Sequence, residues 1–120
     1  MSVGIVGGSV SPSTALTLNA QTGTTYTFVL TDANNTLVTA SNASAQTYTI
    51  PPNSSVAYPI GSQLNIIQIG AGQVSFAQGS GVTIASNGAT STAPKLRVQY
   101  SSASAIKVNT DSWYVVGDIA

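Results

Sequence analysis

The stretch that decides the fold is Pro51–Ile84, PPNSSVAYPIGSQLNIIQIGAGQVSFAQGSGVTI. Its two leading prolines fix φ and remove two backbone donors, so a strand must end just before them. Gln63–Ile69 then nearly alternates polar and apolar side chains and is rich in β-branched residues, which predicts the central strand. Gly70–Gly72 supplies the φ freedom of a tight reversal, so we predict a hairpin that returns along Val74 and Phe76.

Short strand signals continue on both sides of this stretch. After a break at Gln78–Gly81, a third strand is predicted at Val82–Ile84. No sustained internal repeat is evident, and no helical period separates the strands. Strands about ten residues apart predict an all-β fold, an antiparallel β-sandwich or small barrel of short strands. The other predicted strands cover residues 14–19, 24–31, 36–40, 46–50, 95–100, 106–108 and 113–116.

The alternation within these strands predicts which side chains face the core, because successive side chains point to opposite faces. A turn is predicted at residues 101–103. The side chains assigned to the core are Leu16, Leu18, Tyr26, Phe28, Leu30, Leu96, Val98 and Tyr100, with Tyr48 aligned with Ile50.

The 120 residues suit a single β domain over residues 14–120. Residues 1–13 mix apolar side chains with three glycines and are predicted to form an edge strand of this domain or an arm that lies on a neighbouring subunit. The candidate assembly contacts are Val3, Ile5, Val6 and Val10 in this segment, and Trp113 and Tyr114 in the last predicted strand.

Charge is scarce in this sequence, with three acidic and three basic residues that balance to zero. Three cations cannot build the basic face that phosphates require, so nucleic acid is excluded as a partner. The chain has no run of about 18 apolar residues, so we expect no membrane partner. Met1–Gly4 lacks the basic and apolar regions of a signal peptide, which predicts synthesis in the cytoplasm without secretion.

The residues that usually carry chemistry are also scarce. There is no cysteine and no histidine, so zinc, copper and haem sites lack their ligands and a serine nucleophile lacks its base. The aspartates are Asp32, Asp111 and Asp118, each next to a predicted turn or chain end. Gly70–Gly72 lacks the lysine and the helix of a phosphate loop. We therefore expect no enzyme, no catalytic residue, no metal and no cofactor.

Four aromatic residues admit two interpretations. They could line a platform that stacks on sugar rings, or they could belong to the core or a subunit interface, where aromatic residues are enriched. Because Trp113 and Tyr114 are adjacent and face opposite ways, at most one of them is buried in the protomer. The four are Tyr58, Tyr100, Trp113 and Tyr114.

From about Thr25 to the C-terminus, the chain resembles a small β-rich module of structural proteins of tailed bacteriophages, both head decoration (cement) and tail-fibre proteins. The resemblance carries no catalytic residues. The pieces that carry it, in order, are Leu37-Val38, Pro51–Ser55, Tyr58–Gly61, Ile67–Gly72, Gly81–Ile84, Leu96–Ser101 and Trp113–Asp118.

The resemblance implies a virion component. The expected function is a capsid decoration protein, a homotrimer that binds the major capsid protein on the outer capsid surface and stabilises the capsid through subunit contacts. The alternative is a tail-fibre or receptor-binding module that recognises a host surface glycan, with exposed loops such as Ala85–Pro94 as the contact.

Overall fold

The computed structural model describes residues 15–120. The chain is rich in strands, and its one helical element in this part is the short 3-10 helix η2 (Leu30–Ala33), so the all-β class is confirmed. The strands are β1 (Thr17–Gln21), β2 (Thr25–Thr27), β3 (Thr36–Ala40), β4 (Gln46–Ile50), β5 (Gln63–Gln68), β6 (Val74–Gln78), β7 (Thr83–Ala85), β8 (Ser102–Asn109) and β9 (Ser112–Gly117).

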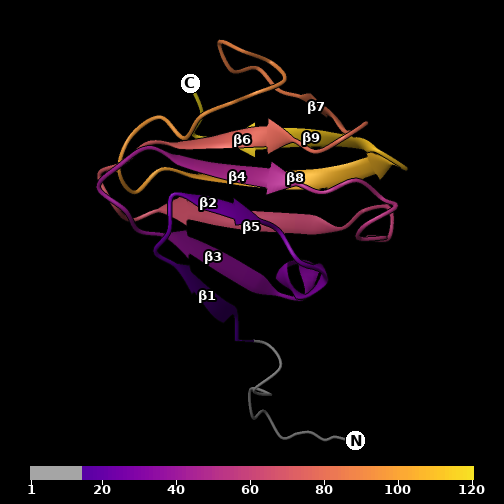
Figure 1. Cartoon of the computed structure of the whole chain (residues 1–120), viewed down its shortest axis with the longest axis horizontal. Helices are drawn as coiled ribbons and strands as arrows, with labels where there is room; N and C mark the ends of the chain where they lie inside the picture. The colour runs from indigo at the N-terminus through magenta and orange to yellow at the C-terminus, as the bar shows by residue number, and fades with distance from the viewer. Residues whose placement is uncertain (1–14) are drawn as a thin grey trace, which may run out of the picture.

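The strands form two sheets. The larger sheet has six strands in the order β1-β3-β5-β8-β9-β7, and the smaller has the order β2-β4-β6. Figure 1 shows the strands stacked one above another, from β1 at one end to β6 and β9 near the other. As predicted, β5 occupies an interior position, between β3 and β8.

The first six strands form three stacked coils. Each coil gives one strand to the six-stranded sheet and the next strand to the three-stranded sheet, and all pairings between successive coils are parallel. The expectation of antiparallel pairing is therefore wrong for these strands. It holds for β5 with β8 and for β8 with β9, whereas β7 pairs with β9 in parallel.

The predicted hairpin at Gly70–Gly72 is also wrong, because β5 and β6 belong to different sheets and do not pair. Neither glycine has a positive φ. They are required because the coil beneath lies so close: a Cβ on Gly72 would lie 1.8 Å from the carbonyl oxygen of Ser44, and one on Gly70 would lie 2.4 Å from the backbone nitrogen of Asn42. The Gly72 N–H donates to the Asn42 carbonyl at 2.8 Å, which joins the two bends.

One hydrophobic core joins the two sheets. Val38 and Ile66 contribute to it from the six-stranded sheet, and Tyr48 and Phe76 from the three-stranded sheet. Phe28 is also buried, and its ring lies 5.9 Å from that of Tyr48 and 6.4 Å from that of Phe76, measured between centroids. Within the strands β3, β4, β5 and β6, buried side chains alternate with less buried ones, as the period of two requires.

Several predicted core residues lie on the surface instead. Leu16 and Leu18 are exposed, so the first strand presents its polar side inward. Leu30 lies in η2 rather than in a strand and is exposed. Val98 and Tyr100 are exposed because residues 98–101 form a turn; of the predicted strand at 95–100, only two isolated bridges at Lys95 and Leu96 form.

The later part of the chain closes one end of the stack. Lys95 bridges to Ser75 of β6, and Leu96 bridges to Ile119 near the C-terminus, both antiparallel. The predicted turn at residues 101–103 is wrong, since Ser102 already begins β8. At the opposite end, β1 and β2 are the outermost strands that the structure describes.

Candidate interaction sites

Trp113 and Tyr114 are adjacent in β9 and face opposite ways, as predicted. Trp113 is 1% exposed and belongs to the core. Its ring and the ring of Tyr58 form a T-shaped pair with centroids 5.3 Å apart. Trp113 is thus wrong as an assembly contact, because its side chain is enclosed by its own protomer. Tyr114 is 54% exposed and lies opposite Ile106 of β8, so it remains available.

The other predicted assembly contacts, Val3, Ile5, Val6 and Val10, lie outside the described residues, as does the predicted arm at 1–13. What the structure does describe is the strand that follows them. β1 is the outermost strand at its end of the six-stranded sheet within residues 15–120 and pairs there with β3. Leu16 and Leu18 are exposed, and Leu18 is 66% accessible.

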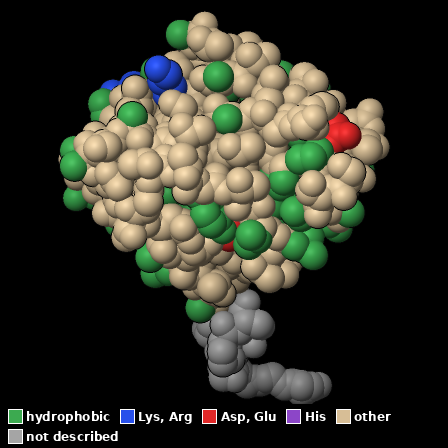
Figure 2. Space-filling view, viewed as in Figure 1, with side chains coloured by type: hydrophobic (Ala, Val, Ile, Leu, Met, Phe, Trp, Pro, Cys, Tyr) green, Lys and Arg blue, Asp and Glu red, His purple; other side chains and the backbone are tan. Residues whose placement is uncertain are grey.

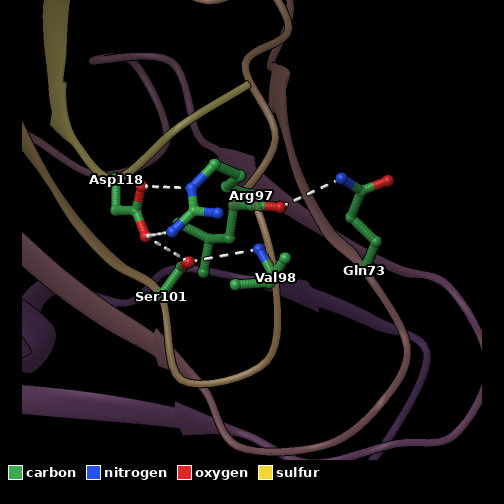
Figure 3. Close-up of polar contacts among 6 residues, drawn as sticks. Gln73, Arg97, Val98, Ser101 and Asp118 are labelled. Carbon is green, nitrogen blue, oxygen red and sulfur yellow. Dashed lines mark hydrogen bonds and ion pairs between the residues drawn. The ribbon is translucent and has the colours of Figure 1, made fainter.

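A polar cluster holds the turn after Leu96, as Figure 3 shows. Arg97 binds Asp118 through two hydrogen bonds, from Nε to Oδ1 at 2.7 Å and from Nη2 to Oδ2 at 3.0 Å. Ser101 Oγ donates to Asp118 Oδ2 at 2.6 Å and accepts from the Val98 N–H at 3.1 Å. Arg97 and Ser101 lower the pKa of Asp118, and Asp118 raises the pKa of Arg97.

The same turn presents an exposed aromatic ring. Tyr100 is 67% exposed and has φ of +70°, a left-handed conformation that costs a bulky residue about 1–3 kcal/mol. The turn is held by the Tyr100 N–H, which donates to the Gln68 carbonyl, and by Gln99 Nε2, which donates to the Ile69 carbonyl at 3.0 Å. The ring is therefore displayed on a fixed support.

A hollow of about 600 Å³ lies beside β1, β2 and η2. Asp32 is buried at its wall and accepts hydrogen bonds from Tyr26 Oη at 2.7 Å, Asn19 Nδ2 at 2.9 Å and the Val29 N–H at 2.9 Å. Burial and the neighbouring Asp32 raise the pKa of Tyr26 to about 12. Both carboxylate oxygens of Asp32 therefore accept hydrogen bonds, and these bonds connect η2 to β1 and β2.

A buried lysine anchors the loop between β4 and β5. Lys107 is 2% exposed, and its Nζ donates to Asn53 Oδ1 and to the Tyr58 carbonyl, each at 2.7 Å. Asp111 Oδ1 accepts from the Asn53 N–H at 2.8 Å. Sequence analysis missed this cluster and the Arg97–Asp118 pair, since no local pattern marks partners that lie so far apart in the chain.

Little formal charge remains at the surface. Asp32 and Lys107 are buried, and Arg97 and Asp118 form an ion pair with each other. Asp111 is half-buried, which leaves Lys95 exposed without an ion pair within residues 15–120. Figure 2 shows one face on which blue and red atoms occupy only small areas.

Together, the fold and these sites define a strand-rich domain of three parallel coils with an antiparallel end and a nearly uncharged surface. The chain matches no family model, and no curated protein matches it in sequence. Among residues 15–120, no helix has the length and apolar character needed to cross a membrane, and no group of three or more acidic, histidine or cysteine side chains is placed to hold a metal ion.

Proposed function

We propose that this protein is a capsid decoration protein of a tailed bacteriophage. In this role it binds the major capsid protein on the outer surface of the virion as a homotrimer and stabilises the shell through its contacts. It carries out no reaction. Its two sheets act as a β-sandwich around one core, and residues 1–13 act as an arm.

The observation that carries this proposal is the distribution of charge. Two of the six charged side chains are buried and two more neutralise each other, while large apolar side chains such as Leu18 and Tyr114 are exposed. A surface of this kind gains little from long-range electrostatic attraction and binds through apolar contact and backbone hydrogen bonds. Such binding suits permanent attachment to a large neutral surface.

The first test is reattachment of the purified protein to capsids that lack it, at low and high salt. Because charges contribute little, occupancy should change by less than about twofold between 0.05 and 1 M NaCl. Over this range the screening length falls from more than about 10 Å to about 3 Å, so a contact that depended on exposed ion pairs would weaken strongly. A loss of binding of tenfold or more at high salt would contradict an uncharged contact.

The arm is tested by deletion of residues 1–10. Val3, Ile5, Val6 and Val10 have the composition for adding a strand to another subunit's sheet edge, and β1 offers such an edge beside exposed Leu16 and Leu18. The shortened protein should keep its thermal transition and lose capsid occupancy. Unchanged occupancy would remove the arm from the account.

A second candidate function is a tail-fibre or receptor-binding module that binds a host glycan. The observation in its favour is Tyr100, an exposed ring on a rigid turn, since aromatic faces stack on sugar rings. Copy number separates the two functions. Hundreds of copies per particle would support decoration, and a few trimers per particle would support the tail module.

A further inference from the structure

The outer face of the six-stranded sheet is the side that points away from the core. Because Val38, Ile66 and Val115 are buried, the alternate residues of their strands point outward. The register aligns Leu18, Leu37, Asn65, Ser104 and Val116 in one row across five strands. The next outward row on one side of this row contains Ile67, and the next outward row on its other side contains the paired residues Ile106 and Tyr114.

This outer face carries no charge. Lys107 is the one charged residue in the nine strands that the structure describes, and its side chain is buried on the inner side. Solvated sheet faces and edges usually carry lysine or other charged side chains, which keep chains from associating. The outward residues of the three-stranded sheet are uncharged too, so the two outer faces differ in their apolar content and not in their charge.

The three-stranded sheet provides an internal comparison. Its outward rows are Thr25, Thr47 and Ser75, and Thr27, Thr49 and Ala77, so five of the six side chains carry a hydroxyl. Hydroxyl groups hydrate well, whereas leucine, isoleucine, valine and tyrosine side chains gain about 25 cal/mol per Å² of apolar surface removed from water. The two faces of one domain thus differ in the way expected of a covered and a solvated side.

Three polar side chains near the middle of this outer face, Gln63, Asn65 and Ser104, already have hydrogen-bond partners. Ser104 Oγ donates to Asn65 Oδ1 at 2.7 Å, and Gln63 Nε2 donates to Asn65 Oδ1 at 2.8 Å and to Ser104 Oγ at 3.2 Å. Burying polar groups is costly mainly when they lose hydrogen bonds to water without replacement. This patch can be covered by an apolar surface while it keeps these bonds.

We propose that the outer face of the six-stranded sheet is a two-fold contact between two copies of this chain, separate from the three-fold contacts of the proposed homotrimer. When identical faces meet, each charge risks facing its own copy, so an uncharged face is the kind best suited to self-association. With strands about 4.8 Å apart and about 3.3 Å per residue, five strands of five residues cover roughly 400 Å² in projection. A pair hides roughly 800 Å² before side-chain relief is counted, so the relief of the leucine, isoleucine and tyrosine side chains must add about 200 Å² to reach the size of about 1,000 Å² at which specific interfaces begin.

Sedimentation equilibrium of the purified full chain tests this proposal without any capsid. The wild-type chain should sediment above the monomer mass, and Ile67→Lys, which places a charge on the central strand of the face, should weaken self-association at least tenfold. Thr47→Lys is the matched control, because Thr47 is an outward residue on the central strand of the other sheet. It should associate like the wild type.

Val116→Lys is the second variant in case Ile67→Lys does not fold, since Val116 is exposed in the protomer and a lysine there fits without repacking. Far-ultraviolet circular dichroism verifies folding of each variant. A monomeric wild-type chain, equal association of the folded Ile67→Lys or Val116→Lys variant, or dissociation by Thr47→Lys would each overturn the proposal. A monomeric chain whose capsid binding is lost in Val116→Lys would assign the face to the capsid protein instead.

Discussion

Tyr58 and Trp113 meet at right angles, with ring centroids 5.3 Å apart and an interplanar angle of 89°. Tyr58 belongs to the loop between β4 and β5, and Trp113 to the last strand. Their contact therefore ties the connection between the parallel coils to the antiparallel end of the sheet. The Tyr58 hydroxyl extends this link, because it donates to the Val29 carbonyl at 2.8 Å.

Two tyrosine hydroxyls should respond oppositely to removal. Tyr48 Oη is buried without a hydrogen-bond partner among the described residues, so Tyr48→Phe should leave the free energy of unfolding unchanged or raise it by up to about 1 kcal/mol. Tyr58→Phe leaves the Val29 carbonyl without its donor and should lower it by about 1 kcal/mol. Urea unfolding at pH 7 measures both. A larger loss for Tyr48→Phe than for Tyr58→Phe would contradict the assigned hydrogen bonds.

Stability should fall in alkaline solution. Burial raises the pKa of Tyr48 to about 12, and burial together with Asp32 raises that of Tyr26 to about 12, both above the ordinary value of 10.0. The folded state thus favours the neutral phenols, and their contribution is complete below pH 10 and is lost as the pH rises from about 10 to 12. Urea midpoints at pH 9 and 11.5 should show this loss, and it should be smaller in Tyr48→Phe. An identical loss in the variant would remove Tyr48 as a cause.

Two glycines should differ sharply in their tolerance of alanine. Gly72→Ala places a Cβ 1.8 Å from the Ser44 carbonyl oxygen and should cost about 3 kcal/mol or more, because the stacked coils must separate. Gly81 has φ of +77°, and a Cβ added there would meet no heavy atom within 4 Å, so Gly81→Ala should cost only about 1 kcal/mol from backbone strain. Thermal and urea unfolding give both values. Equal costs would indicate that the coils are not packed as described.

Lys107→Met should loosen the loop between β4 and β5. The substitution keeps the length of the side chain but leaves Asn53 Oδ1 and the Tyr58 carbonyl without their donor, at a cost of about 1–3 kcal/mol. The Gly61 amide, which donates to the Lys107 carbonyl, should then exchange its hydrogen faster. Lys95→Met, at an exposed position, is the control and should change neither quantity. Unchanged stability in Lys107→Met would show that the lysine does not hold the loop.

The sequence predicts individual strands well where the alternation is clean. The bounds of β3 and β4 match the prediction, and β5 lies in the interior of its sheet as expected. Pairing direction could not be predicted, because alternation of faces is the same in parallel and antiparallel strands. The hairpin predicted at Gly70 and Gly72 was wrong for a related reason, because glycine occurs both in tight turns and where two backbones approach closely.

The repeat of the coils was hidden by unequal connections. Thr17 pairs with Thr36 and Leu37 with Asn65, so the offset between paired residues changes from 19 to 28 positions. The sequence indicates that Trp113 and Tyr114 face opposite ways, but it does not indicate which of the two is buried, so both were predicted as contacts. The prediction that Leu16 and Leu18 face the core was wrong, because alternation separates the two faces of a strand but does not identify which face is buried.

The most direct test of the central claim, that this chain works as a building block of the capsid surface, is imaging of virions with and without the protein. The account predicts density of the size of this domain repeated over the outer capsid lattice in wild-type particles and missing from particles made without it. Density confined to the tail, or capsids that look the same in both preparations, would contradict it.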